Sequence, residues 1–340
     1  MKTDLKSLTY ENLESLMLSM GEKKFRSQQL YQWIHNKHIN DVNKMNISKT
    51  LRENLSANYY IAQGEIVTKL SSKLDETEKY LLKYNEDLCE CVFMKYKHGN
   101  TVCISTQVGC KMGCEFCAST VNGFTRNLTT GEMLDQVYTV HKNSGKISNI
   151  VLMGSGEPLD NLENVVDFIK IINSESGLNI GQRHITLSTC GIPPKIDELS
   201  KLNLQINLAI SLHAFDDEKR NAIMPINRKY SLQELLSSVK NYYYTTSRRI
   251  TYEYALIKDL NDNPRDAFRL GRLIKPVAKC HVNLIPVNYI KEKDFKQSNN
   301  AKIFQETLQK MGIETTIRRE LGSDINASCG QLRNEYIKKV

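Results

Sequence analysis

Three cysteines in one short segment are the residues of this chain most suited to chemistry. Cys110, Cys114 and Cys117 have the spacing C-x3-C-x2-C. The β-branched run at 101–108, directly before them, predicts a strand that leads into their loop. Three thiolates on one loop can bind three irons of a cubane iron–sulfur cluster and leave the fourth iron open. An open iron is a Lewis acid that a substrate amine and carboxylate can chelate.

A structural zinc site is the alternative interpretation of the same cysteines. Closed zinc sites usually have four Cys or His ligands, and no fourth ligand stands nearby at zinc-finger spacing. Gly109 and Gly113 each precede a cysteine, and glycine tolerates the positive φ that a tightly wrapped loop demands. Phe116, before the third cysteine, would suit a ligand that packs over a cluster. The spacing favours iron–sulfur over zinc and leaves both open.

The composition indicates a globular protein of a reducing compartment. No apolar run approaches the roughly 20 residues of a membrane span, and the N-terminus lacks a signal sequence. We therefore expect a cytoplasmic location and no membrane partner. In a reducing compartment, nine cysteines argue for metal binding or catalysis rather than for disulfides. The net charge of +8 is consistent with a polyanionic partner but does not establish one.

The elements that must position the cysteines alternate between strand and helix, which predicts an α/β fold with a parallel sheet. A capping box, Thr129 with Glu132, opens one of the helices. Six βα units are too few for an eightfold barrel, so we expect a partial (β/α)6 barrel that is open along one side. The expected strands are 101–108, 149–153, 184–188, 205–212, 249–257 and 281–287, with a closing strand at 313–318.

The residues before this barrel predict two smaller parts. Helices expected at 8–20, 26–38 and 48–57 form a small N-terminal domain, 1–62, and strand-like runs form a β-hairpin extension, 63–98, that links it to the core at 99–340. The helical domain is either a bundle with a solvated basic rim or an RNA-docking module. The side chains that would contact phosphates are Lys23, Lys24, Arg26, Lys37 and His38.

Small or polar residues follow several of the predicted strands. Parallel βα folds bind ligands at the carboxyl ends of their strands. Gly156 allows close backbone approach there, and Glu157 can accept a hydrogen bond from an ammonium group. Ser188, His213 and Asn288 can bond ribose hydroxyls, a carboxylate or an adenine edge. A strand-end Ser or Asn can instead cap the following helix.

Together these motifs resemble the radical S-adenosylmethionine (SAM) RNA adenine methyltransferases of the RlmN/Cfr family. The resemblance covers nearly the whole chain and implies a radical SAM barrel, a [4Fe-4S] cluster and SAM as cofactors. The matching segments are Gly21–Arg26, Trp33–His35, Cys103–Cys117, Met153–Pro158, Thr186–Thr189, Ser211–His213, Met224–Asn227, Asn283–Pro286 and Ala327–Leu332.

The resemblance also implies a role for individual residues. Cys329 becomes methylated, Cys103 resolves the protein–RNA intermediate by forming a disulfide with it, and Glu90 accepts a proton. Glu90 is followed by Cys91, where family members have Thr. The cluster ligands would be Cys110, Cys114 and Cys117, and the SAM-binding residues would be Gly156, Glu157, Ser188, Ser211, Leu212, His213 and Asn288.

The function that the resemblance implies is methylation of C2 of an adenosine in 23S rRNA and in tRNA, 3′ of the anticodon. Each turnover would use two SAM molecules and an external electron donor of the flavodoxin or ferredoxin type. Resistance enzymes of the family act instead on C8 of the same rRNA adenosine; Pro158 resembles the C2 branch, while Ser155 departs from it. A non-catalytic, zinc-stabilised RNA-binding protein is a second alternative, but it leaves Cys329 unexplained.

Overall fold

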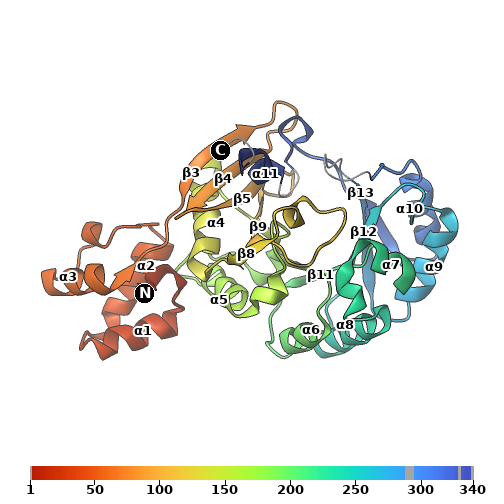
Figure 1. Ribbon diagram of the computed structural model, residues 1–340. Helices are drawn as coiled ribbons and strands as arrows, with labels where there is room; N and C mark the ends of the chain where they lie inside the picture. The colour runs from red at the N-terminus through yellow and green to blue at the C-terminus, as the bar shows by residue number, and fades with distance from the viewer. Residues whose placement is uncertain (1, 288–294, 328–330, 338–340) are drawn as a thin grey trace.

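A computed structural model describes residues 2–287, 295–327 and 331–337 of the chain. Its N-terminal lobe consists of helices α1 (Tyr10–Ser19), α2 (Lys24–His35) and α3 (Lys49–Asn58), with a parallel pair of short strands, β1 (Thr3–Asp4) and β2 (Tyr59–Tyr60). Figure 1 shows this lobe at one end of the molecule. The three predicted helices are confirmed, and Ser48 caps α3 by accepting a hydrogen bond from the Leu51 amide at 3.2 Å.

The rest of the chain is organised around one ten-stranded sheet that does not close. Its order is β14-β13-β12-β11-β10-β9-β6-β5-β4-β3, and β6 with β9 to β14 forms a continuous parallel array. The predicted partial barrel is therefore confirmed. The parallel strands are β6 (Thr101–Cys103), β9 (Asn149–Leu152), β10 (Ile185–Thr189), β11 (Asn207–Ser211), β12 (Ile250–Leu256), β13 (Cys280–Pro286) and β14 (Glu314–Ile317).

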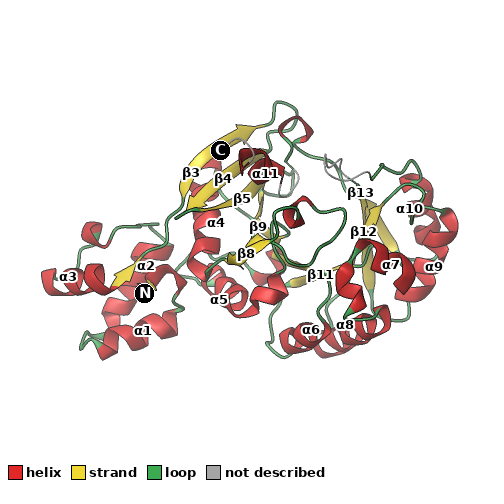
Figure 2. Ribbon diagram, viewed as in Figure 1, coloured by secondary structure: helices red, strands yellow, loops and turns green. Residues whose placement is uncertain are grey.

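Helices cover the outer side of this array (Figure 2). In α9 the buried positions 267, 270, 271 and 274 follow helical spacing, so one face packs inward and the other meets solvent. Among the described residues, no helix is long and apolar enough to cross a membrane. The helices are α4 (Thr130–Ser144), α5 (Leu162–Asn173), α6 (Pro193–Ser200), α7 (Asp217–Ile223), α8 (Leu232–Thr246), α9 (Pro264–Ile274) and α10 (Ala301–Lys310). A last helix, α11 (Gln331–Ile337), instead contacts β5 and the short turn Ala118–Thr120.

The predicted β-hairpin extension is an antiparallel continuation of the barrel sheet. Strands β3 (Glu65–Ser71), β4 (Glu78–Tyr84) and β5 (Asp87–Met94) pair in order, and β5 pairs with β6. The extension is therefore part of the barrel sheet as well as a link to the N-terminal lobe, because β5 pairs directly with β6.

The predicted strand 101–108 is wrong as a single element. The chain leaves the sheet after Cys103, and a second short strand, β7 (Gln107–Gly109), pairs with β8 (Phe124–Asn127) instead. At the break, the Ser105 hydroxyl donates to the Glu90 carbonyl at 2.7 Å, and the Ser105 amide donates to Gln136 at 2.9 Å. These side-chain contacts from distant segments replace the backbone ladder, so β propensity alone could not locate the break.

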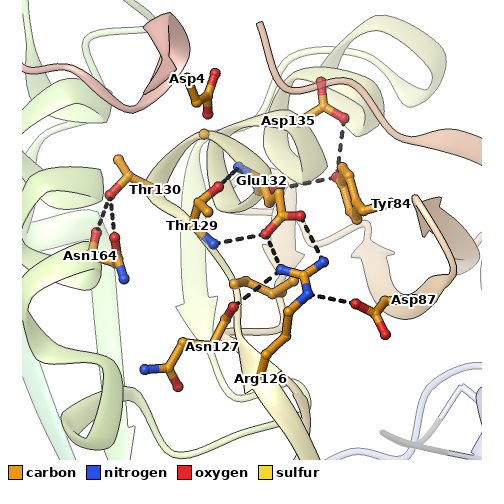
Figure 3. Close-up of polar contacts among 12 residues, drawn as sticks. Asp4, Tyr84, Asp87, Arg126, Asn127, Thr129, Thr130, Glu132, Asp135 and Asn164 are labelled. Carbon is orange, nitrogen blue, oxygen red and sulfur yellow. Dashed lines mark hydrogen bonds and ion pairs between the residues drawn. The ribbon is translucent and has the colours of Figure 1, made fainter. Parts of the chain in front are cut away.

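The N-terminus of α4 joins the lobe, the extension and β8 (Figure 3). Its predicted capping box, Thr129 with Glu132, is present. Arg126 of β8 donates to both oxygens of Glu132, at 2.8 and 2.9 Å, and to Asp87 of β5 at 2.5 Å. A bidentate pair of this kind fixes direction as well as distance. The strand that follows the cysteine loop is therefore held to both α4 and the extension.

The lobe itself is docked on α4 through buried charges. Lys6 is fully buried and lies 2.6 Å from Asp135, which also accepts a hydrogen bond from Tyr84 at 3.1 Å. A Cβ on Gly131 would lie 1.9 Å from a carboxylate oxygen of Asp4, so only glycine permits this approach. The position of the lobe relative to the barrel is thus set by specific polar contacts.

Candidate cluster and SAM site

The loop of three cysteines has the backbone geometry that its glycines predict. Gly109 has φ of +75° and Gly113 has φ of +73°, both in the left-handed region. A Cβ on Gly109 would lie 1.8 Å from the carbonyl oxygen of Gly123, which accepts a hydrogen bond from the Cys110 amide at 3.1 Å. The start of the loop can therefore close against its end only with glycine at position 109.

The three thiols lie close enough to influence one another. Burial raises the pKa of the Cys110 thiol to about 12, with Cys117 adding to the shift. Burial also raises the pKa of Cys114 well above its usual value, and the neighbouring Cys117 and Cys110 raise it further. A metal bound by these sulfurs would oppose this shift, because its positive charge stabilises thiolates.

A single metal ion and a cubane cluster place different demands on three thiolate ligands. Among the described residues, no group of three His, Cys, Asp or Glu side chains is close enough to hold one metal ion. Zinc–sulfur bonds of about 2.3 Å would bring the sulfurs to about 4 Å of each other. In a cubane cluster each thiolate binds a separate iron, so the sulfurs stand farther apart.

Glu157 is buried beside the cysteine loop and already engages the backbone. Its carboxylate accepts hydrogen bonds from the Leu159 amide at 2.9 Å and the Cys190 amide at 2.7 Å. Burial raises its pKa, while these hydrogen bonds act in the opposite direction. Gly156 has φ of +110°, and a Cβ there would lie 2.6 Å from Gln107. The backbone at Gly156 therefore packs closely against β7, which contains Gln107.

His213 lies at the end of β11 in a left-handed conformation, with φ of +57°. Its Nδ1 accepts a hydrogen bond from the Ala255 amide at 2.9 Å. Burial, assisted by the charge of Arg220, lowers its pKa to about 3, so the ring is neutral and carries its proton on Nε2. Phe116 packs edge-on against this ring, with centroids 4.6 Å apart. The structure thus brings the predicted aromatic residue of the loop against a predicted SAM-binding residue.

Arg220, which the sequence analysis did not identify, organises the ends of two strands. It is fully buried and donates to the carbonyls of Cys190 at 2.6 Å, Leu212 at 3.1 Å and Ser211 at 3.2 Å. Asn227, at the end of a matching segment, holds it through a bond of 2.8 Å. The sequence signal that could have identified Arg220 is its position seven residues before Asn227. Ser188 lies on β10, where it pairs with Ala209 of β11.

One cavity of about 220 Å³ is lined by three of the predicted site residues, Cys103, Cys117 and His213. Cys103 pairs with Val92 across β5 and β6. Cys329 and Asn288 lie outside the described residues. Ala327, two positions before Cys329, and Val287, one position before Asn288, both line the cavity.

Glu90 lies on the face of β5 that carries Val92, and both of its carboxylate oxygens are engaged. One contacts the ammonium of Lys79 at 3.1 Å, and the other accepts a hydrogen bond from the amide of Arg333 in α11. Lys79 in turn donates to the carbonyl of Asn326 at 2.8 Å. The predicted proton acceptor is therefore linked to both sides of the segment that contains Cys329.

An open barrel with a three-cysteine loop at the carboxyl ends of its strands defines a radical SAM enzyme. The Radical SAM superfamily model matches residues 104–270, and the model of the ribosomal RNA large subunit methyltransferase N-terminal domain matches residues 3–61. The chain belongs to the RlmN family of radical SAM methyltransferases. This membership implies SAM and an iron–sulfur cluster as cofactors.

The relatives resemble the chain over nearly its whole length. It is 54% identical to the probable dual-specificity RNA methyltransferase RlmN of Clostridium novyi (strain NT), covering 98% of both chains. It is 56% identical to the protein of the same name from Clostridium botulinum (strain Eklund 17B / Type B), covering 97% of this chain and 96% of the relative. The crystal structure of a radical SAM methyltransferase from Sphaerobacter thermophilus superimposes with a TM-score of 0.90 at 38% identity, covering 97% and 98%.

Proposed function

We propose that this protein methylates C2 of an adenosine in 23S rRNA and of the adenosine 3′ of the anticodon in tRNA. Family membership supports RNA as the substrate, since the relatives are dual-specificity RNA methyltransferases. The observation that carries the proposal is the single cavity lined by Cys103, Cys117 and His213, with the neighbours of Cys329 and Asn288 in its wall.

Three residues would hold the cluster and others would hold SAM. Cys110, Cys114 and Cys117 are proposed as ligands of a [4Fe-4S] cluster, with one iron left for SAM. Bound together, the reduced cluster and SAM supply an organic radical, and SAM also supplies a methyl group. Adenine C2 lies between two ring nitrogens and is electron-poor, so it needs radical chemistry. The proposed SAM-binding residues are Gly156, Glu157, Ser188, Ser211, Leu212, His213 and Asn288.

The contacts described above support particular tasks for two of the SAM-binding residues. His213 presents Nε2–H, so it acts as a hydrogen-bond donor, because Nδ1 is occupied by the Ala255 amide. Glu157 would accept from the ammonium group of SAM, through a carboxylate that the amides of Leu159 and Cys190 already orient.

On the protein, two cysteines would act on the methyl group and one carboxylate would accept the proton. The Cys329 thiolate is proposed to accept the methyl group, since only a thiolate is a competent nucleophile. The proton from C2 would pass to Glu90. The Cys103 thiolate would then attack the Cys329 sulfur, so that a disulfide forms as the bond from that sulfur to the transferred carbon breaks, and a proton added to this carbon completes the methyl group of the released RNA. The electrons for the cluster would come from an external protein of the flavodoxin or ferredoxin type.

The regiochemistry is tested by digesting product RNA and comparing its nucleosides with 2-methyladenosine and 8-methyladenosine standards. We expect 2-methyladenosine. Pro158 supports this choice: it is buried at the first position of a short helical turn, Pro158–Asn161, where its fixed φ stiffens the loop beside Glu157. Predominant 8-methyladenosine would assign the chain to C8 chemistry and leave the two-cysteine mechanism in place.

A further inference from the structure

A second cavity, of about 750 Å³, lies at the opposite end of the barrel from the cysteine loop. Its lining includes the starts of several parallel strands: Thr101 of β6, Asn207 of β11 and His281 of β13. In a βα fold the ligands of the reaction bind at the other, carboxyl, ends of these strands. This cavity is therefore not part of the candidate SAM site.

The two cavities share part of their walls. Met94 and Tyr96, at the end of β5 and just after it, line both, as does Arg318, which follows β14. These residues stand on opposite sides of the open barrel, because β5 and β14 lie on either side of the parallel array. The space inside the barrel therefore leads from the amino-terminal edge of the strands toward Cys103.

The described wall of this second cavity carries more arginines than carboxylates. Arg183, Arg249 and Arg318 are exposed residues in its wall. Arg249 pairs with the exposed Glu314 at 2.5 Å, and Arg248 is committed to the Ile206 carbonyl at 2.7 Å and to neighbouring side chains. The histidines in the wall are His98 and His281, and the acidic lining residue is Glu253.

Glu253 offsets only part of this charge. It is 4% exposed, burial raises its pKa, and Asn283 donates a hydrogen bond to it at 3.0 Å. Among the described residues, four arginines outnumber the two carboxylates near them, Glu253 in the wall and Glu314 paired with Arg249, and this excess leaves a positive potential inside a concave wall, which attracts a polyanion.

An aromatic pair stands at the edge of the same cavity. The rings of Tyr96 and His98 are stacked, with centroids 5.1 Å apart and planes 18° from parallel. His98 is exposed, and so is Lys97 between the two rings. Aromatic faces beside cations are the features on which single-stranded nucleic acids stack their bases and place their phosphates.

We propose that single-stranded RNA next to the target adenosine binds in this basic cavity, and that the target base reaches the reaction cavity from this side of the barrel. The inference rests on the proposed function, since it assigns a binding surface to the RNA substrate. Arg183, Arg249 and Arg318 bind phosphates, and the Tyr96–His98 pair stacks a base. RNA fits better than an acidic protein, because the surface is recessed inside the barrel and an unpaired strand is thin enough to enter.

The first experiment measures binding of a synthetic RNA stem–loop, with the adenosine 3′ of the anticodon, by fluorescence anisotropy at several salt concentrations. The double variant Arg183→Gln/Arg249→Gln should bind roughly tenfold more weakly near 0.1 M salt, and its log–log salt slope should fall by about 1.4, or about 0.7 for each phosphate that is no longer neutralised. Arg265→Gln, on the outer helix α9, is the control for removal of an exposed arginine elsewhere on the surface and should bind like the wild type. Thermal unfolding verifies that each variant is folded.

A second experiment tests stacking with 2-aminopurine beside the target base. Its fluorescence should be quenched on binding to the wild type and to Tyr96→Phe, and less quenched with Tyr96→Leu. A purely structural role of Tyr96 would not produce this difference. In steady-state assays the KM for RNA should rise in the arginine double variant while kcat is largely kept.

Several outcomes would overturn the inference. Unchanged affinity and salt slope in the double variant would do so, as would an equal loss of affinity in Arg265→Gln. If RNA binding were intact but reduction by an acidic electron-transfer protein were abolished, the surface would serve that partner instead. These results are separate from the proposed function, whose failure would appear as wild-type protein that binds this RNA but does not methylate it.

Discussion

Lys79 and Glu90 form a buried ion pair, with 3.1 Å between the ammonium nitrogen and a carboxylate oxygen, on the adjacent strands β4 and β5. Their side chains are 0% and 3% exposed. Lys79 also binds the Asn326 carbonyl, and Glu90 accepts from the Arg333 amide. The pair therefore binds the backbone three residues before Cys329, at Asn326, and four residues after it, at Arg333.

Removing one member of this pair should cost more stability than removing both. We expect Lys79→Met to lower the free energy of unfolding by about 3–5 kcal/mol, because a buried carboxylate loses its counter-charge. Lys79→Met/Glu90→Leu should recover most of this loss. Denaturant unfolding of both variants measures the difference, and equal destabilisation would show that the two charges are not coupled. The recovered double variant should still fail to methylate RNA if Glu90 is the proton acceptor.

The three loop cysteines should together hold one cluster. Anaerobically reconstituted wild type should contain about four irons per chain, the number in a cubane. Replacing Cys110, Cys114 and Cys117 by Ala should abolish both iron binding and SAM cleavage. Cys280→Ala, on β13, is the control and should retain the iron. A triple variant that keeps its iron would place the cluster elsewhere.

Cys103→Ala should trap a covalent complex between protein and RNA. Without the cysteine that resolves the intermediate, methylated Cys329 can still react with the base but cannot be released by disulfide formation. Mass spectrometry and denaturing gels should detect the adduct, and Cys103→Ala/Cys329→Ala should show none. Normal turnover by Cys103→Ala would exclude the resolving role.

The N-terminal lobe should contribute to RNA binding through its exposed lysines. Lys23, Lys24 and Lys37 are exposed, although Lys24 is 3.0 Å from Glu14. His38 instead packs on Tyr138 of α4, with centroids 4.4 Å apart, which removes it from the proposed phosphate contacts. Changing the three lysines to Gln should weaken stem–loop binding and reduce its salt dependence by roughly 0.7–0.9 for each phosphate that a lysine neutralises in the wild type.

Point variants test this lobe better than its deletion. Deletion would expose Asp135, which lies against the fully buried Lys6, together with the apolar face of α4. Lys49→Gln, an exposed lysine of α3, serves as the control for removal of a single lysine charge elsewhere in the lobe. If the triple variant binds RNA as tightly as the wild type over the whole salt range, the lobe has a structural role only.

His35 should make the fold sensitive to acid. It is fully buried in α2 between Tyr31 and Tyr138, and burial, assisted by Lys6 and His38, lowers its pKa to about 3. The unfolded chain binds a proton near pH 6.5 and the folded protein does not, so stability is complete above pH 6.5 and falls as the pH drops toward 3. One such group costs about 1.4 kcal/mol per pH unit in that window.

The variant His35→Gln isolates this contribution. It keeps a polar group near the Tyr138 hydroxyl, which lies 2.9 Å from Nδ1 of His35, but it does not titrate. The loss of unfolding free energy between pH 7 and pH 5 should be smaller in the variant by about 2 kcal/mol. Identical pH profiles for the two proteins, measured by denaturant unfolding, would mean that His35 is not the titrating group.

The features that could be predicted from the sequence alone depend on residues that lie close together along the chain. The positive φ at Gly109 and Gly113 and the capping box at Thr129 were predicted and are present. Each of these involves residues within a few positions of each other, so local sterics and hydrogen bonding are sufficient. The alternation of strands and helices similarly predicted an open barrel, because the spacing of apolar residues within a segment distinguishes a strand from a helix.

The tertiary structure decided the features that join distant segments. The break after Cys103 depends on Glu90 and Gln136, the strand ends depend on the buried Arg220, and the tether around Cys329 depends on Lys79. An isolated charged residue in a sequence normally indicates solvent exposure. Burial of Lys79 and Arg220 is stable only because partners 7 to 247 positions away complete their hydrogen bonds, and no local pattern encodes that match.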